Sequence, residues 1–83
     1  MNDLDASIKK ILEGYGLLGT PPASLGPDDD LYQRGMSSHA SVNVMLALED
    51  EFDVEFPDAL LKRDTFRTVA TIREALKSMG VPA

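Results

Sequence analysis

Apolar residues recur at intervals of three and four positions in three stretches of the chain, and this spacing predicts three long helices. The first stretch has its apolar positions at Leu4, Ile8, Ile11, Leu12 and Tyr15. Gly14 and Gly16 close it, as glycines often do at a helix C-terminus. The last stretch, TFRTVATIREALKSMG, has an apolar side made of Val69, Ile72, Leu76 and Met79. Gly80 lies beyond its end.

The segment between the first two helices, LLGTPPASLGPDDDLYQRGMS, is rich in Gly, Pro and Asp and has no sustained period. A loop of roughly twenty residues is long for a compact domain. We therefore expect three leucines to point inward and hold it: Leu17, Leu25 and Leu31. Further along, FDVEFPD is short and ends in Pro57, which favours an extended linker with Val54 and Phe56 directed toward the core. A short helix is expected over about residues 58–62.

The middle helix begins near Ser37 or Ser38, runs to about Phe52 and has two apolar stripes instead of one. The stripe expected to face the core consists of Val44, Met45, Leu48 and Phe52. Val42 and Leu46 lie on a neighbouring arc, whose direction is shared by Ser38, His39 and Glu49. Either another helix covers this second pair, or it forms an exposed apolar strip that docks a partner protein.

Together these elements predict an all-α fold, a small four-helix bundle of three long helices and one short one, in a single domain of residues 1–83. Apolar residues make up 43% of the chain, which is typical of a globular protein. The absence of cysteine excludes disulfides, thiolate zinc sites and cysteine nucleophiles. No secretory signal or membrane-spanning run is apparent, so we expect a soluble, cytoplasmic protein.

Acidic residues outnumber basic ones by 14 to 8, which gives a net charge of −6. We therefore expect nucleic acid and anionic membranes to repel the protein, and basic protein surfaces to attract it. Between residues 35 and 61 there is no lysine or arginine, and the acids in this region are Glu49, Asp50, Glu51, Asp53, Glu55 and Asp58. Such a region is either a solvated face or a docking surface for basic partners.

The motif GMSSHAS, residues 35–41, places two hydroxyls and the only histidine at the start of the middle helix. A serine nucleophile needs a base within hydrogen-bond reach, but Ser38 and His39 are sequence neighbours whose side chains diverge on a helix. A metal site is also disfavoured, because the DDD run at residues 28–30 lacks the pattern of a calcium loop. Two interpretations remain. The serine is an ordinary N-cap, or it carries a phosphodiester that the free amides and the helix dipole stabilise.

The segment GMSSHASVNVMLALEDEFDVEFPD resembles the phosphopantetheine-attachment region of acyl carrier proteins. That family has glycine, an apolar residue, aspartate, the modified serine and leucine, followed by a helix with an acidic, phenylalanine-bearing end. An apolar-acidic-apolar-Pro-Asp linker comes next, and the order of elements is similar over the whole chain. The resemblance implies an acyl-carrier-protein-like fold and a 4′-phosphopantetheine arm, moved from coenzyme A to Ser38 by a phosphopantetheinyl transferase. Ser37 competes for this modification.

The chain departs from the family pattern at four positions. Ser37 replaces the usual aspartate, His39 replaces leucine, and Ala40 and Asn43 replace residues that are often acidic in fatty-acid carriers. The pattern is more similar to a group of stand-alone bacterial aminoacyl carrier proteins, whose ligases resemble seryl-tRNA synthetases. This resemblance implies that the arm carries an activated amino acid, glycine or alanine, as a thioester.

Under this interpretation the protein is a monomeric carrier without enzymatic activity or a metal site, and it passes its cargo to a downstream acceptor enzyme. The residues expected to dock partners are His39, Val42, Leu46, Glu49, Asp50, Asp53 and Glu55. One alternative is a carrier of fatty acyl, polyketide or nonribosomal peptide cargo. Another, from a different class, is an unmodified helical adaptor that binds a partner helix through the same strip.

Overall fold

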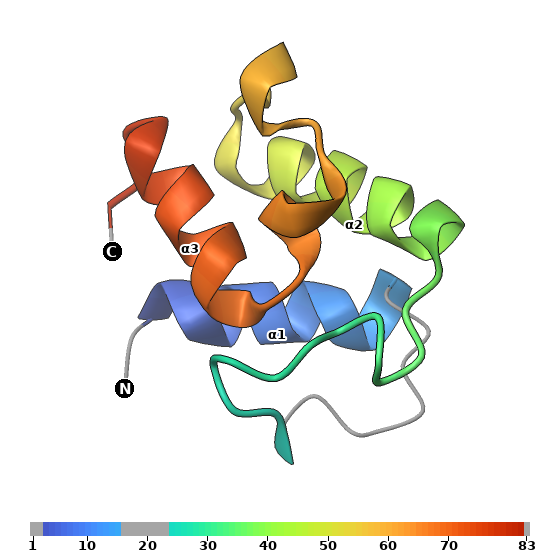
Figure 1. The fold of residues 1–83 in the computed structure, drawn as a ribbon. Helices are drawn as coiled ribbons and strands as arrows, with labels where there is room; N and C mark the ends of the chain where they lie inside the picture. Colours follow the sequence, from blue (N-terminus) through green and yellow to red (C-terminus); the bar gives the residue numbers. More distant parts are fainter. Residues whose placement is uncertain (1–2, 16–23, 83) are drawn as a thin grey trace.

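The structure is a computed structural model that describes residues 3–15 and 24–82 (Figure 1). These ranges contain three α-helices, α1 (Asp3–Tyr15), α2 (Ser38–Phe52) and α3 (Val69–Ser78). Two short 3-10 helices, η2 (Asp58–Leu60) and η3 (Arg63–Phe66), lie between α2 and α3 in the sequence. No strand occurs in these ranges, and the predicted all-α fold is confirmed. The short helix expected at about residues 58–62 is the 3-10 turn η2, and η3 was not expected from the sequence.

Helix α3 begins at Val69, the first of its predicted apolar positions and four residues after the start of the predicted stretch, because Thr68 and Thr71 form a capping box. The Thr71 amide donates to Thr68 Oγ1 and the Thr68 amide donates to Thr71 Oγ1, each at 3.0 Å. These bonds satisfy amides that have no partner inside the helix. The first two residues of the predicted stretch, Thr65 and Phe66, belong to η3 instead, and this turn lies between α2 and α3 in Figure 1.

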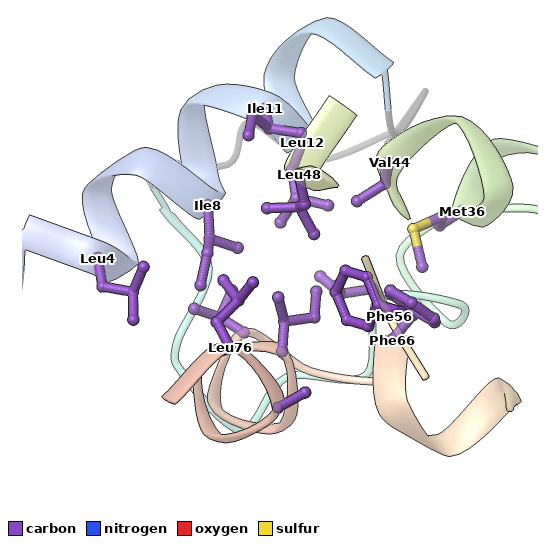
Figure 2. Packing of buried hydrophobic residues seen from close by; sticks show 14 of the residues in the cluster. Leu4, Ile8, Ile11, Leu12, Met36, Val44, Leu48, Phe56, Phe66 and Leu76 are labelled. Atoms are coloured by element: carbon purple, nitrogen blue, oxygen red, sulfur yellow. The ribbon is translucent and has the colours of Figure 1, made fainter. Parts of the chain in front are cut away.

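The core forms where the apolar faces of the three α-helices meet, and Figure 2 shows labelled side chains from these elements pointing toward one another. Its fully buried large side chains are Ile8, Leu12, Leu31, Val44, Leu48, Val69, Ile72 and Leu76. Phe56, from the linker, packs against Phe66 of η3 with ring centroids 5.3 Å apart. The linker thus enters the core through Phe56, as predicted, while Val54 is only partly buried.

The described part of the long loop is fixed by leucines and by hydrogen bonds to the start of α3. Leu25 and Leu31 are buried as predicted, while Leu17, like Gly16, lies outside the described residues. The Leu31 amide donates to the Arg67 carbonyl at 2.7 Å, and the Ala70 amide donates to the carbonyl of Pro27 at 2.9 Å. The loop is therefore joined to a segment that is distant in the sequence.

Arg67 strengthens this junction through two carboxylates. Its guanidinium is 2.9 Å from Asp30 Oδ2 and 2.7 Å from Asp64 Oδ1. Partial desolvation raises the pKa of the Asp30 carboxyl, but hydrogen bonds from the Gln33 amide and Arg67 outweigh it, so the pKa lies below its ordinary value. The hydrogen bond from Arg67 likewise lowers the pKa of Asp64. Asp30 therefore has a structural role in the acidic run of residues 28–30.

Candidate functional site

The successive residues of the motif at the start of α2 have different structural roles. Gly35 has a φ of 113°, a conformation that L residues with a side chain rarely adopt, and it turns the chain toward the helix. Met36 is buried in the core. Ser37 is the N-cap, because its Oγ accepts a hydrogen bond from the Ala40 amide at 3.0 Å. The hydroxyl that caps the helix is thus that of Ser37, and Ser38 is the first helical residue.

Ser38 is exposed, and its hydroxyl takes no part in capping. Its Oγ accepts a hydrogen bond from Arg63 Nη1 at 3.1 Å. The catalytic pair considered from the sequence is not formed in the described structure, since the side-chain partner of Ser38 there is Arg63 and not His39. A guanidinium is a donor only and cannot take the proton of the serine hydroxyl. The site offers an accessible alcohol beside a cation and a helix N-terminus.

Arg63 is held in this position by Tyr32. The guanidinium carbon lies 3.8 Å from the centroid of the Tyr32 ring, a cation–π contact. The Tyr32 hydroxyl donates to the Arg63 carbonyl oxygen at 3.0 Å, so that both the side chain and the backbone of Arg63 are fixed. Sequence reasoning missed both residues, because Arg63 is 25 positions from Ser38 and no periodic pattern connects them.

A pocket of about 410 Å³ adjoins Ser38 and Arg63. Its apolar lining comes from α2 and from the segment around η3, and includes Val42, Met45, Leu61 and Phe66. A hydroxyl, a cation and an apolar pocket in one place fit a phosphopantetheine arm, which has an anionic phosphodiester at one end and a long, mostly uncharged chain. In the ranges that the structure describes, no group of acidic or histidine side chains could hold a metal ion.

The second apolar stripe of α2 is exposed, and none of the helices in the described ranges covers it. Val42 and Leu46 are 49% and 52% exposed, whereas Val44 and Leu48, on the core face, are 0% exposed. The interpretation that a neighbouring helix buries Val42 and Leu46 is therefore wrong. Leu61, also exposed, lines the same pocket as Val42.

The polar residues predicted to surround this strip have different environments. His39 is exposed, as are three of the predicted acids, Asp50, Asp53 and Glu55. Glu49 is partly buried, and its Oε2 accepts a hydrogen bond from the Phe56 amide at 2.8 Å. Glu49 therefore fixes the linker to α2, a structural role that its place in an acidic run did not indicate.

Known proteins with similar sequences also carry a phosphopantetheine attachment site. Residues 16–76 match the family described as the phosphopantetheine attachment site. An aminoacyl carrier protein from Agrobacterium fabrum is 43% identical over 74 residues, which cover 89% of each chain. The chain belongs to the phosphopantetheine attachment-site family and is a homologue of aminoacyl carrier proteins. The prosthetic group of this family is 4′-phosphopantetheine, as the resemblance implied.

Two solved structures are similar over most of the chain. One is a crystal structure of an engineered Bradyrhizobium japonicum glycine:[carrier protein] ligase with the Agrobacterium tumefaciens carrier protein and AMP. It has a TM-score of 0.86 and 44% identity, and covers 88% of this chain and 97% of the other. The second is a Bradyrhizobium japonicum glycine:[carrier protein] ligase with a glycylated carrier protein, with a TM-score of 0.75, 26% identity and coverages of 89% and 99%. The expected acyl-carrier-protein-like fold is therefore confirmed.

Proposed function

We propose that this protein is an aminoacyl carrier and not a catalyst, with its phosphopantetheine arm on Ser38. The observation that carries the proposal is the division between the two serines. The Ser37 hydroxyl caps α2, whereas the Ser38 hydroxyl is exposed beside a cation and a pocket. The arm supplies the thiol that this cysteine-free chain lacks, on which a carboxylic acid is held as a thioester.

In the attachment step Ser38 Oγ attacks the pyrophosphate phosphorus of coenzyme A that carries the pantetheine arm. The bond from this phosphorus to the bridging oxygen of the pyrophosphate breaks, and 3′,5′-ADP leaves with that oxygen. The base comes from the phosphopantetheinyl transferase, which works with magnesium, because the side-chain partner of Ser38 in the described structure is a guanidinium that cannot accept a proton. The amides at the start of α2 and the positive end of its dipole stabilise the anionic product. Residues 1–83 act as a single carrier domain, monomeric and cytoplasmic.

The proposed cargo is glycine or alanine, delivered with ATP by a ligase that resembles seryl-tRNA synthetase. Support comes from the relatives seen with a glycine:[carrier protein] ligase, one of them glycylated. The ligase docks on the exposed pair Val42 and Leu46 with His39 nearby. Exposed acids at Asp50, Asp53 and Glu55, with Glu49 beside them, orient basic partner surfaces, an effect that weakens as salt screens the charges.

The test is the intact mass of the protein after incubation with coenzyme A and a broad-specificity transferase. The wild type and Ser37→Ala are expected to gain one phosphopantetheinyl group each, and Ser38→Ala none. Modification of Ser38→Ala but not of Ser37→Ala would move the attachment to Ser37. An unmodified wild-type chain would favour the adaptor. With ATP, ligase and equal amounts of glycine, alanine and fatty acids, the further mass increase then identifies the cargo.

A further inference from the structure

Arg63 differs from the other arginines in the described part of the chain by having no ion pair. Arg34, Arg67 and Arg73 all bridge to carboxylates there. Arg63 is instead stacked on Tyr32 and donates to an uncharged oxygen, that of Ser38. In a chain with a net charge of −6, a guanidinium fixed in place but lacking a bound carboxylate is an available site for an anion.

The guanidinium of Arg63 lies where it could contact a phosphodiester formed on Ser38. Nη1 lies 3.1 Å from Ser38 Oγ, the atom that becomes the bridging oxygen when a phosphodiester forms there. The charged, nonbridging oxygens are then two bonds from Oγ, on the same phosphorus. The guanidinium presents further N–H groups beside the one already donating, and a planar fork of this kind suits phosphate oxygens.

We propose that Arg63 is a phosphate-binding residue, held by Tyr32, that pairs with the phosphodiester of the arm on Ser38. This proposal rests on the proposed function. Arg63 and Ser38 line the same pocket with Val42, Met45 and Phe66, so the pair fixes the first bonds of the arm between α2 and η3. Lys62 also lines this pocket, but it makes no hydrogen bond to Ser38 in the described structure.

The experiment compares the wild type, Arg63→Gln and Lys62→Gln, each as the apo protein and after complete loading by coenzyme A with excess transferase. The quantity measured is the holo-minus-apo difference in Tm at low salt. Arg63→Gln is expected to lower this difference by about 2–4 °C relative to the wild type. This is the contribution to Tm that an exposed charge pair makes in a domain of this size. Lys62→Gln is the matched control, with the adjacent cation removed, and is expected to leave the difference near the wild-type value.

A second readout observes the phosphate directly. The ³¹P resonance of the loaded protein should move between the wild type and Arg63→Gln, and stay in place in Lys62→Gln. In high salt the Tm effect should shrink, because the pair is exposed to solvent. If the wild type takes up no mass, the proposed function itself fails.

If all three proteins load and the Tm difference and ³¹P shift are unchanged, or change equally in the two variants, Arg63 is no specific phosphate ligand. A variant Arg63→Gln that cannot be loaded would assign Arg63 to the contact with the transferase, and would also overturn the proposal.

Discussion

The inward and outward faces of α2 carry the same kinds of residue with opposite consequences. Leu48 and Val44 are fully buried, whereas Leu46 and Val42, two positions earlier in each case, are about half exposed at 52% and 49%. The same division separates Ser37, which caps the helix, from Ser38, which does not. Residue type therefore does not separate the scaffold from the candidate site on this helix. The direction of the side chain does.

The sharpest test of this division is the pair Leu48→Ala and Leu46→Ala. Removing the buried side chain of Leu48 should cost about 3 kcal/mol of unfolding free energy, because it leaves a cavity in the core. The same change at Leu46 removes a side chain that is half exposed, and should alter stability by about 0.5 kcal/mol or less. Urea denaturation of the apo proteins measures both values. Equal losses would mean that Leu46 belongs to the core.

The second prediction measures loading by the ligase, for which the exposed Leu46 is expected to matter although it matters little for stability. Leu46→Asp should lower the kcat/KM with which the ligase aminoacylates the holo protein by about tenfold, since a charge at the centre of an apolar contact is left desolvated. The Tm should stay close to that of the wild type. Ala6→Asp, at an exposed position of α1, is a control that adds the same charge away from the proposed docking surface. Equal loading of both variants would remove Leu46 from that surface.

The scaffold could be predicted from the sequence because its signals are local. Helical periodicity located most core positions of α1, α2 and α3, but Tyr15 is exposed, and Met45 and Phe52 are only partly buried. The inward leucines Leu25 and Leu31 followed from the need to fix a long loop. The sequence also identified Val42 and Leu46 as a second stripe, but it left open whether another helix covers them, and the structure shows them exposed. The start of α3 was less accurate, since the predicted stretch began at Thr65 and the capping box at Thr68 delays the helix to Val69.

The contacts that shape the candidate site could not be predicted, because they join residues far apart in the chain. Arg63 reaches Ser38 across 25 positions and Arg67 reaches Asp30 across 37. Both arginines follow the cation-free region of residues 35–61. The sequence around them does not indicate that Arg67 pairs with carboxylates and Arg63 with a serine. That difference depends on η3, a 3-10 turn without a periodic signal of its own.

The third and smallest prediction concerns Arg67, the structural counterpart of Arg63. Its hydrogen bonds help to hold the pKa values of Asp30 and Asp64 below their ordinary range. A carboxyl with a lowered pKa in the folded state adds stability that is complete above its unfolded pKa of about 4 and is lost as the pH falls through the folded value. The Tm difference between the wild type and Arg67→Gln should therefore be largest at neutral pH and shrink below about pH 4.

Thermal melts at about pH 7 and pH 3 measure this change. The substitution keeps the Arg67 carbonyl that accepts from the Leu31 amide, so the readout isolates the side chain. Arg34→Gln is the matched control, because the bridge from Arg34 to Asp29 is longer, at 3.6 Å, and should contribute less at either pH. A Tm difference for Arg67→Gln that is the same at both pH values would show that the two carboxylates do not contribute through their charge. Arg67 would then support the loop by packing alone. The two arginines would differ in where they lie, and the ion pairs of Arg67 would not distinguish it energetically from Arg63.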